Sequence, residues 1–197
     1  MVEIKYKGAC VSLAGDVYEP AEDSYLLADA AIHYVKEDMR VLEIGTGTGF
    51  VSSVLLANVD VELTSTDINP HAVICARSNG IEVIRTDMFN GLKAISCFDI
   101  IIFNAPYLPT SRDEKIPGWL NYAFDGGSDG REAVERFLDG VCEYLVPDGV
   151  ILLLVSSLTG IEHVSSGIRS MGFDVDIVGR DKCSFEELVV LMGKRRT

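Results

Sequence analysis

Apolar residues in this chain fall into short continuous runs separated by segments with helical spacing. The runs at residues 98–103 and 150–155 show no alternation of apolar and polar positions, which is typical of strands covered on both faces of a parallel sheet. Further strands are predicted at residues 39–45, 61–67 and 81–87. The chain therefore repeats a strand-then-helix order, which indicates a doubly wound α/β fold.

The helices predicted beside these strands are marked by apolar spacing and by proline. Residues 21–35 carry apolar side chains at helical spacing after Pro20, which predicts an amphipathic helix that packs on the sheet or covers it. A second helix is expected at about residues 50–58. A third opens at Asn69-Pro70, because proline suits the first helical turn, and a fourth is predicted near residues 158–171.

The C-terminal part of the chain predicts a hairpin. Two strand-like runs, residues 172–178 and 185–192, are separated by a linker that is too short for a parallel crossover. One antiparallel strand is therefore expected at the end of an otherwise parallel, seven-stranded sheet. Residues 1–20 are mixed and irregular. Residues 111–130 form a long non-periodic stretch, which inside a compact domain is more often functional than idle.

Length and charge narrow the possible functions. The 197 residues fit one domain, and 17 Lys and Arg against 30 Asp and Glu give a formal net charge of −13. A chain this acidic is not expected to hold bare nucleic acid or an anionic membrane surface through a broad basic face. No apolar run approaches the roughly 18 residues that span a bilayer. Five scattered cysteines without a C-x-x-C pair suit buried thiols better than disulfides or a zinc site, so we expect a cytoplasmic location and no metal site.

The first predicted strand ends in a glycine-rich turn. Glu43 precedes Gly45, Gly47 and Gly49, which alternate with other residues before the next helix. Glycines let a ligand touch the backbone, and a helix N-terminus offers free N–H groups. The G-x-G-x-G spacing, with Phe50 at the sixth position, departs from the dinucleotide fingerprint and disfavours NAD. For this loop alone, a tight turn without a ligand is the alternative.

Acidic residues close the next two strands. Asp67 and Asp87 are expected at the carboxyl edge of the sheet, where open α/β folds bind ligands. Asp67 suits the two hydroxyls of a ribose and Asp87 suits an adenine amino group, although each alone is more often a turn or cap residue. Together with the glycine turn, they predict a nucleoside-carrying cofactor that has no pyrophosphate to cradle.

The most specific pattern, Asn104-Ala105-Pro106-Tyr107, directly follows an apolar strand. A planar amino group is a poor nucleophile because its lone pair is delocalised. The Asn104 side-chain oxygen and the Ala105 carbonyl can accept its two hydrogens and align the nitrogen with an electrophile. Tyr107 can stack on the planar group. For the tetrapeptide alone, an Asn-x-Pro turn that caps the strand is the alternative.

These motifs together resemble the class I S-adenosylmethionine-dependent methyltransferases that carry an N-P-P-Y motif. They resemble most closely the HemK-like protein-glutamine methyltransferases of archaea and eukaryotes that modify class 1 release factors. The similarity runs through residues 17–24, 42–49, 66–70, 103–107 and 126–132. The Y-E-P-A-E-D and G-G-x-x-G-R-E segments separate this group from other N-P-P-Y enzymes. The resemblance implies a Rossmann-like single domain over residues 1–197, in which residues 1–37 form an extension and helix over the cofactor site.

The resemblance also implies a reaction and a set of site residues. The sulfonium methyl group of S-adenosylmethionine passes in line to the glutamine side chain of a Gly-Gly-Gln loop, and proton loss follows. The residues implied in the transfer are Asn104, Ala105, Pro106 and Tyr107. Those implied in cofactor binding are Ser24, Glu43, Gly45, Gly47, Asp67, Ile68, Asp87, Met88 and Asn104, with Asp23 and Phe50 as neighbours. The histidines that are not expected to act in catalysis are His33, His71 and His163.

Two further expectations follow from the resemblance. The family motif usually has proline where this chain has Ala105, but Pro106 still restricts Ala105 to extended conformations, so we expect an active enzyme with a looser clamp. A small zinc-binding activator subunit is expected to form a heterodimer by covering an apolar edge near residues 81–85. The apolar and polar alternation of that segment also suits an ordinary half-covered edge strand.

Other functions stay open from the residues. One alternative is a nucleic-acid methyltransferase, because adenine N6, cytosine N4 and guanine N2 present the same kind of planar amino group to this motif. Such enzymes usually hold nucleic acid with a basic surface or an added recognition domain, and neither is visible in the sequence. A non-catalytic S-adenosylmethionine-binding subunit fits the altered motif. The aromatic residues Trp119, Tyr122 and Phe124 either cover the substrate or anchor residues 111–130 to the core.

Overall fold

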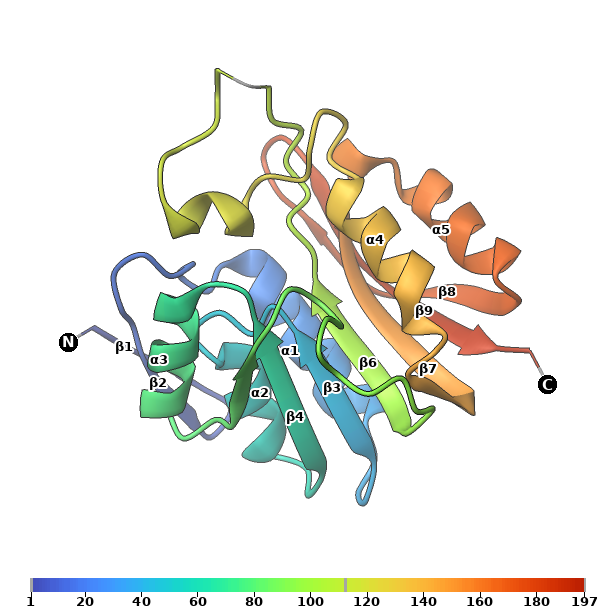
Figure 1. Cartoon of the computed structure of the whole chain (residues 1–197), viewed down its shortest axis with the longest axis horizontal. Coiled ribbons are helices and arrows are strands. Elements are labelled where there is room, and N and C mark those ends of the chain that lie inside the picture. Colours follow the sequence, from blue (N-terminus) through green and yellow to red (C-terminus); the bar gives the residue numbers. More distant parts are fainter. Residues whose placement is uncertain (1, 112, 197) are drawn as a thin grey trace.

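The computed structural model, which describes residues 2–111 and 113–196, is built around a seven-stranded sheet (Figure 1). From one edge to the other the strands are β5 (Val83–Arg85), β4 (Glu62–Asp67), β3 (Arg40–Ile44), β6 (Phe98–Asn104), β7 (Leu145–Ser156), β9 (Glu187–Arg195) and β8 (Phe173–Lys182). The pairs from β5 to β7 are parallel, and β9 is antiparallel to both of its neighbours. The predicted fold class is therefore confirmed.

The antiparallel strand lies one position in from the edge of the sheet, which differs from its expected place at the end. Strand β9 is inserted between β7 and β8, so the hairpin partner β8 forms the edge. Burial gives the physical reason. Residues 188–191 of β9 are all buried, whereas β8 carries exposed acidic side chains such as Asp174 and Asp181. The more apolar strand takes the doubly covered position.

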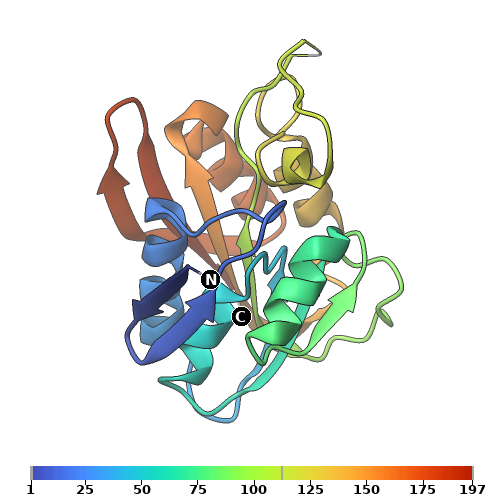
Figure 2. The same cartoon turned by 90° about the vertical axis from the view of Figure 1, so that its left-hand side faces the viewer.

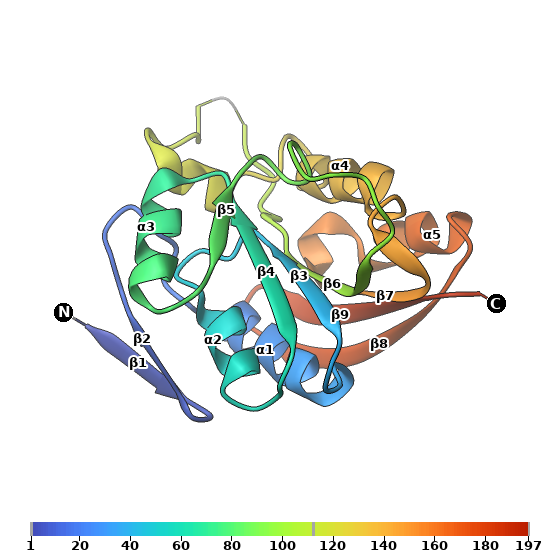
Figure 3. The same ribbon diagram turned by 60° about the horizontal axis from the view of Figure 1, so that its bottom comes forward.

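Helices cover both faces of the sheet (Figure 3). One face packs against α1 (Glu22–Tyr34) and α2 (Phe50–Leu56), the other against α4 (Glu132–Val141) and α5 (Ile161–Ser170), while α3 (Pro70–Ser78) packs on β4 and β5. In β6, Ile100 and Ile102 point to the apolar cluster that includes α1 and α2, whereas Ile101 and Phe103 point to the cluster that includes α4 and α5. Because both faces are covered, residues 100–103 of the strand are all apolar and buried, as the sequence predicts.

Residues 3–12 form a β-hairpin within the segment 1–20, for which the sequence predicts no regular element. Strands β1 (Glu3–Tyr6) and β2 (Ala9–Ser12) pair antiparallel in a separate two-stranded sheet (Figure 2). Its turn residues Lys7 and Gly8 both have positive φ, 42° and 88°, as in a tight two-residue hairpin turn. The hairpin packs through Val11 into the apolar cluster of α1 and α2. Strands of four residues are too short to display a clear alternation in sequence.

Helix α4 was also missing from the sequence prediction. Residues 132–141 form it, and Ala133, Val134, Phe137 and Val141 are its buried side chains. Their spacing is helical, so the signal was present in the sequence.

Two further expectations concern membranes and cysteines. Within the described ranges, no helix is both long enough and apolar enough to cross a bilayer. All five cysteines are unpaired, and they differ in burial: Cys75 is buried and Cys10 is exposed. The cysteines are therefore free, as expected, but the prediction that they are buried holds for Cys75 alone.

Candidate active site

A cavity of about 730 Å³ lies at the carboxyl edge of the sheet, where the strands β3, β4 and β6 end beneath the segment that follows β6 (Figure 1). Its size is within the range of small-molecule sites. All the residues predicted for catalysis or cofactor binding line it: Ser24, Glu43, Gly45, Gly47, Asp67, Ile68, Asp87, Met88, Asn104, Ala105, Pro106 and Tyr107. The neighbours Asp23 and Phe50 line it as well.

Three glycines form the turn between β3 and α2, and two of them, Gly47 and Gly49, have distinct structural roles. Gly45, Gly47 and Gly49 all have positive φ, between 58° and 80°, which favours glycine. A Cβ on Gly49 would lie 2.9 Å from Ile81 Cγ1 and 3.2 Å from Ala76 Cβ, so this residue lets α3 pack closely. A Cβ on Gly47 would meet nothing within 4 Å. Gly47 therefore leaves its backbone open to a ligand in the cavity.

Glu43 is a buried carboxyl at the base of the cavity. Its Oε2 accepts hydrogen bonds from Thr46 Oγ1, at 2.7 Å, and from Ser52 Oγ. Burial raises the pKa of Glu43 to about 7, although these two hydrogen bonds act in the opposite direction. Glu43 therefore changes its charge near neutral pH.

Asp67 holds the glycine turn in place from the end of β4. One carboxylate oxygen accepts a hydrogen bond from the backbone N–H of Gly47 at 2.8 Å, and the other accepts from the N–H of Asn69 at 2.8 Å. Burial raises the pKa of Asp67, and the backbone hydrogen bonds oppose this shift. Each oxygen of a carboxylate can accept a second hydrogen bond, so Asp67 can still take a ribose hydroxyl.

Asp87 and Met88 follow β5 on the far side of the cavity. Asp87 Oδ2 forms an ion pair with Arg136 Nη2 of α4 at 2.7 Å. Met88 has a φ of 48°, which is uncommon for a residue with a side chain and marks a tight local turn. Arg136 also lines the cavity, so α4 contributes a cation beside the carboxylate predicted for the adenine amino group.

The two polar atoms of the Asn104 side chain, at the end of β6, differ in their hydrogen bonding. Its Nδ2 donates a hydrogen bond to Asp23 Oδ2 at 3.0 Å. Its Oδ1 is buried and has no hydrogen-bond partner among the residues that the structure describes. Native proteins rarely bury a polar atom without a partner, so this oxygen is an acceptor with unused capacity. Asn104 is one of the residues that line the cavity.

The rest of the tetrapeptide is packed from behind by the segment that contains Gly126 and Gly130. Gly130 has a φ of 73°, and a Cβ there would lie 2.5 Å from the Tyr107 carbonyl oxygen. Ala105 is buried. Burial, with the nearby charge of Asp23, raises the pKa of Tyr107, which keeps its hydroxyl neutral. The glycines therefore allow a close backbone contact that fixes the motif.

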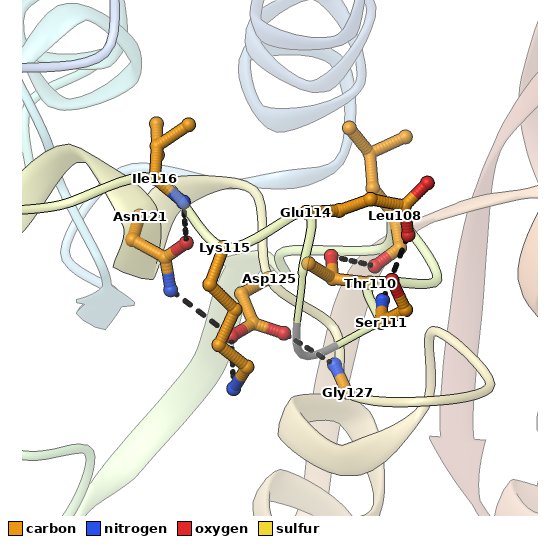
Figure 4. Close-up of polar contacts among 9 residues, drawn as sticks. All are labelled: Leu108, Thr110, Ser111, Glu114, Lys115, Ile116, Asn121, Asp125 and Gly127. Carbon is orange, nitrogen blue, oxygen red and sulfur yellow. Dashed lines mark hydrogen bonds and ion pairs between the residues drawn. The ribbon is translucent and has the colours of Figure 1, made fainter.

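The segment of residues 111–130 is held by polar contacts around Asp125 (Figure 4). Asp125 accepts hydrogen bonds from Lys115 Nζ at 2.7 Å, from Asn121 Nδ2 at 3.0 Å and from the N–H of Gly127 at 3.0 Å. Burial alone would raise the pKa of Asp125, but these hydrogen bonds lower it below its usual value. Leu108 pairs with Asp125 in an isolated β-bridge, which ties the segment to the chain just after the motif.

Aromatic residues connect this segment with its surroundings. Trp119 and Tyr122 stack with ring centroids 5.4 Å apart, and the Arg85 guanidinium lies 5.5 Å from the Trp119 ring centroid. Phe124 packs edge-on against Tyr18 at 5.4 Å. These residues anchor the segment to neighbouring elements, and Trp119, Tyr122 and Phe124 also line the cavity. Covering of the substrate stays a prediction.

Comparison with known proteins assigns the chain to a family. The sequence matches the methyltransferase domain family over residues 35–175. It is 43% identical to the putative protein N5-glutamine methyltransferase MJ0928 of Methanocaldococcus jannaschii, over 98% of each chain. It is 35% identical to methyltransferase HEMK2 of Mus musculus, over 80% of this chain and 79% of that protein. The chain belongs to the HemK-like family of methyltransferases.

A solved structure resembles this methyltransferase along nearly its whole length. The structure is that of the E. cuniculi Mtq2-Trm112 complex, described as responsible for the methylation of the eRF1 translation termination factor. The match has a TM-score of 0.75 and 30% sequence identity, and it covers 92% of this chain and 99% of that one. The family and the fold expected from the sequence motifs are thereby confirmed.

Several cavity residues of the methyltransferase were not singled out from the sequence. Tyr18 donates its hydroxyl hydrogen bond to Asp23 at 3.1 Å, and Glu186 reaches the cavity from the hairpin between β8 and β9. Arg136 was missed because α4 was not assigned. Among the residues that the structure describes, His33, His71 and His163 are not in the cavity lining.

The raised pKa of Glu43 predicts a pH-dependent stability. The folded protein binds the Glu43 proton more tightly than the unfolded chain does, so stability falls as pH rises from about 4.5 to about 7. We expect the free energy of unfolding to lose roughly 3 kcal/mol over this window relative to Glu43→Gln. Urea denaturation at several pH values measures the difference. Glu62→Gln, at an exposed position of β4, is the control, and parallel pH profiles for wild type and Glu43→Gln would contradict the prediction.

Proposed function

We propose that this methyltransferase carries a methyl group from S-adenosylmethionine to the glutamine side chain in the Gly-Gly-Gln loop of a class 1 translation release factor, in the cytoplasm. The observation that carries the proposal is the buried Oδ1 of Asn104, a residue of the cavity lining, because this oxygen has no hydrogen-bond partner within the described residues. A primary amide supplies the N–H that this oxygen needs. The relationship to a protein N5-glutamine methyltransferase and to Mtq2 supports the choice of glutamine in a release factor.

The residues around the cavity fit S-adenosylmethionine. Gly47 leaves backbone open to the cavity, Asp67 keeps acceptor capacity for ribose hydroxyls, and Asp87 lines the cavity with a carboxylate that can accept from an adenine amino group. The carboxyl groups of Glu43 and Asp67 suit a ligand that carries a positive charge at its sulfonium and amino groups. When bound, the cofactor supplies an electrophilic methyl group. Tyr18, which precedes α1, and Ser24, in its first turn, line the same cavity.

The chain's own residues would prepare the amide for attack. Asn104 Oδ1 and the Ala105 carbonyl oxygen accept the two hydrogens of the amide nitrogen and set its direction, so that nitrogen faces the methyl carbon. Tyr107 packs on the plane of the amide. Bound S-adenosylmethionine would supply the methyl group that this nitrogen takes up and would leave without it, and the nitrogen would then lose one proton. The acceptors of that nitrogen stabilise the positive charge that develops on it.

The test is transfer of a labelled methyl group from S-adenosylmethionine to a class 1 release factor, with and without an activator subunit. A Gly-Gly-Ala variant of the factor serves as control. Label that appears on the factor and is lost with the variant supports the proposal. Label on tRNA, rRNA or DNA instead would assign the enzyme to nucleic-acid amino groups. Cofactor binding without transfer to any of these would leave a binding subunit without catalysis.

Ala105 gives a second test of the motif. We expect Ala105→Pro to keep methyl transfer intact or to speed it slightly, because proline removes unfolded-state freedom worth about 0.4–1 kcal/mol while the carbonyl acceptor stays. Steady-state rates and thermal unfolding of the two proteins measure both effects. A tenfold or larger loss of kcat would show that the position requires a residue other than proline in this chain.

We also propose that the free edge of β5 receives a small activator subunit. This strand is the outermost of the sheet, Ile84 on it is 47% exposed, and a groove of about 520 Å³ runs beside it. The complex of Mtq2 with Trm112 supports such a partner. Replacing Ile84 with Asp is expected to weaken heterodimer formation at least tenfold in pull-down titrations, with Leu56→Asp at another exposed apolar position as control. Equal binding by both variants would place the partner elsewhere.

A further inference from the structure

A buried carboxylate from a distant part of the chain holds the side chain of Asn104. Asp23 lies in the first turn of α1 and is 4% exposed. Its Oδ2 accepts hydrogen bonds from Asn104 Nδ2 at 3.0 Å and from the Tyr18 hydroxyl at 3.1 Å. Its other oxygen accepts from the backbone N–H and the hydroxyl of Ser24. Tyr18 and Ser24 thus fix the Asp23 carboxylate at the N-terminal end of α1.

We propose that Asp23 is a positioning residue, which sets the orientation of the Asn104 amide so that Oδ1 faces the substrate nitrogen. The proposal rests on the proposed function, because it concerns the same acceptor. An ionised carboxylate only accepts hydrogen bonds, so the amide nitrogen of Asn104 must face it. The amide oxygen then points the other way. If the Asn104 amide were flipped, its Oδ1 would face Asp23 Oδ2 in a buried environment, and this contact between two acceptors would cost free energy.

Asp23 also strengthens the acceptor that it orients. Hydrogen bonds in a chain polarise one another, and a charged partner gives the stronger bond. A carboxylate that accepts from Asn104 Nδ2 increases the negative charge on Asn104 Oδ1. The polarised chain would run from Asp23 through Asn104 to the substrate amide, whereas the Tyr18 hydroxyl donates to the same Asp23 oxygen as Asn104 Nδ2 and holds the carboxylate in place. Asp23 itself acts through Asn104 and holds no reacting atom.

The test is Asp23→Asn in the full chain. Asparagine has nearly the same volume, but its amide nitrogen can donate to Asn104 Oδ1 and so occupy the acceptor. We expect kcat to fall about 10²-fold, while the Kd for S-adenosylmethionine and the melting temperature change little. Asp29→Asn is the matched control, because this carboxyl lies on the same helix and accepts from Tyr6 and Lys7 away from the cavity. The control is expected to keep the wild-type kcat.

A double-mutant cycle separates positioning from a general structural role. If Asp23 acts through Asn104, then Asp23→Asn causes no further loss of kcat in a protein that already carries Asn104→Ala. Tyr18→Phe is expected to cause a smaller loss than Asp23→Asn, because it removes only one of the bonds to the carboxylate. An unchanged kcat for Asp23→Asn, or losses that multiply in the double variant, would overturn the proposal.

A spectroscopic measurement keeps this inference separate from the proposed function. The side-chain amide resonance of Asn104, identified by its absence in Asn104→Ala, reports the contact with Asp23 without any substrate. We expect Asp23→Asn to shift this resonance and to speed its solvent exchange, whereas Asp29→Asn leaves it unchanged. A wild-type protein that labels no glutamine would refute the proposed function alone. An unshifted resonance in Asp23→Asn would refute the positioning role.

Discussion

Replacing Asn104 with alanine is expected to lower kcat for methyl transfer by about 10²- to 10³-fold. The side chain supplies a buried acceptor, Oδ1, that has no partner in the part of the chain that the structure describes. Without it, the substrate amide loses one of the two contacts that aim its nitrogen at the methyl carbon, and the positive charge that develops there is less well stabilised. We expect the rest of the cavity to keep its shape, because Asn104 is a single residue of the lining, at the end of β6.

Single-turnover transfer to a release factor measures this effect on the chemical step. Asn58→Ala is a suitable control, since the Asn58 amide also donates hydrogen bonds, to the backbone carbonyls of Lys7 and Val54, but Asn58 is not in the cavity lining. Binding of S-adenosylmethionine, followed by calorimetry, identifies a variant that has lost its cofactor site as a whole. If Asn104→Ala transfers methyl groups as fast as the control, the side chain has no part in the reaction.

Replacing Gly130 with alanine is expected to reduce both stability and catalysis. The added Cβ would lie 2.5 Å from the Tyr107 carbonyl oxygen and 3.3 Å from Pro109, so the backbone of the motif has to move. The positive φ of 73° adds a cost of about 1–2 kcal/mol for a residue with a side chain. Because a displacement of about 1 Å can cost about 10² in rate, we expect kcat to fall about 10²-fold.

Gly172→Ala is the matched control for Gly130→Ala. Gly172 also has a positive φ, 89°, but a Cβ there meets nothing within 4 Å, and the residue is not in the cavity lining. Both variants carry the backbone cost, and only Gly130→Ala carries the contact with Tyr107. Urea denaturation and kcat are compared for the two proteins. A loss of kcat of equal size in both would show that the contact behind the motif does not set the reaction geometry.

The site could be predicted from the sequence where its residues are close to strand ends. Glu43 with its glycine turn, Asp67 and Asn104 each lie at or near the end of a run that the sequence predicts to be a strand. In a parallel sheet these runs end at one edge, so the three groups have to meet there. The order of strands along the chain was therefore enough to bring them to one cavity.

The parts of the fold that were missed have weaker or more distant signals. The hairpin of residues 3–12 has strands of four residues, in which a period of two is hard to distinguish from chance. The place of β9 inside the sheet depends on a comparison of burial between two strands, and not on either strand alone. Helix α4 had a readable pattern, and its absence from the prediction also hid Arg136.

By itself, the sequence determined the alternation of strands and helices, the family and the residues at the strand ends, because these depend on short-range patterns of apolar and acidic side chains. Only the tertiary structure decided which side chains touch across the cavity. Asp23 meets Asn104 across 81 positions of sequence, and Arg136 meets Asp87 across 49. Such contacts depend on how helices from both faces pack around the sheet edge, and no local pattern encodes that packing.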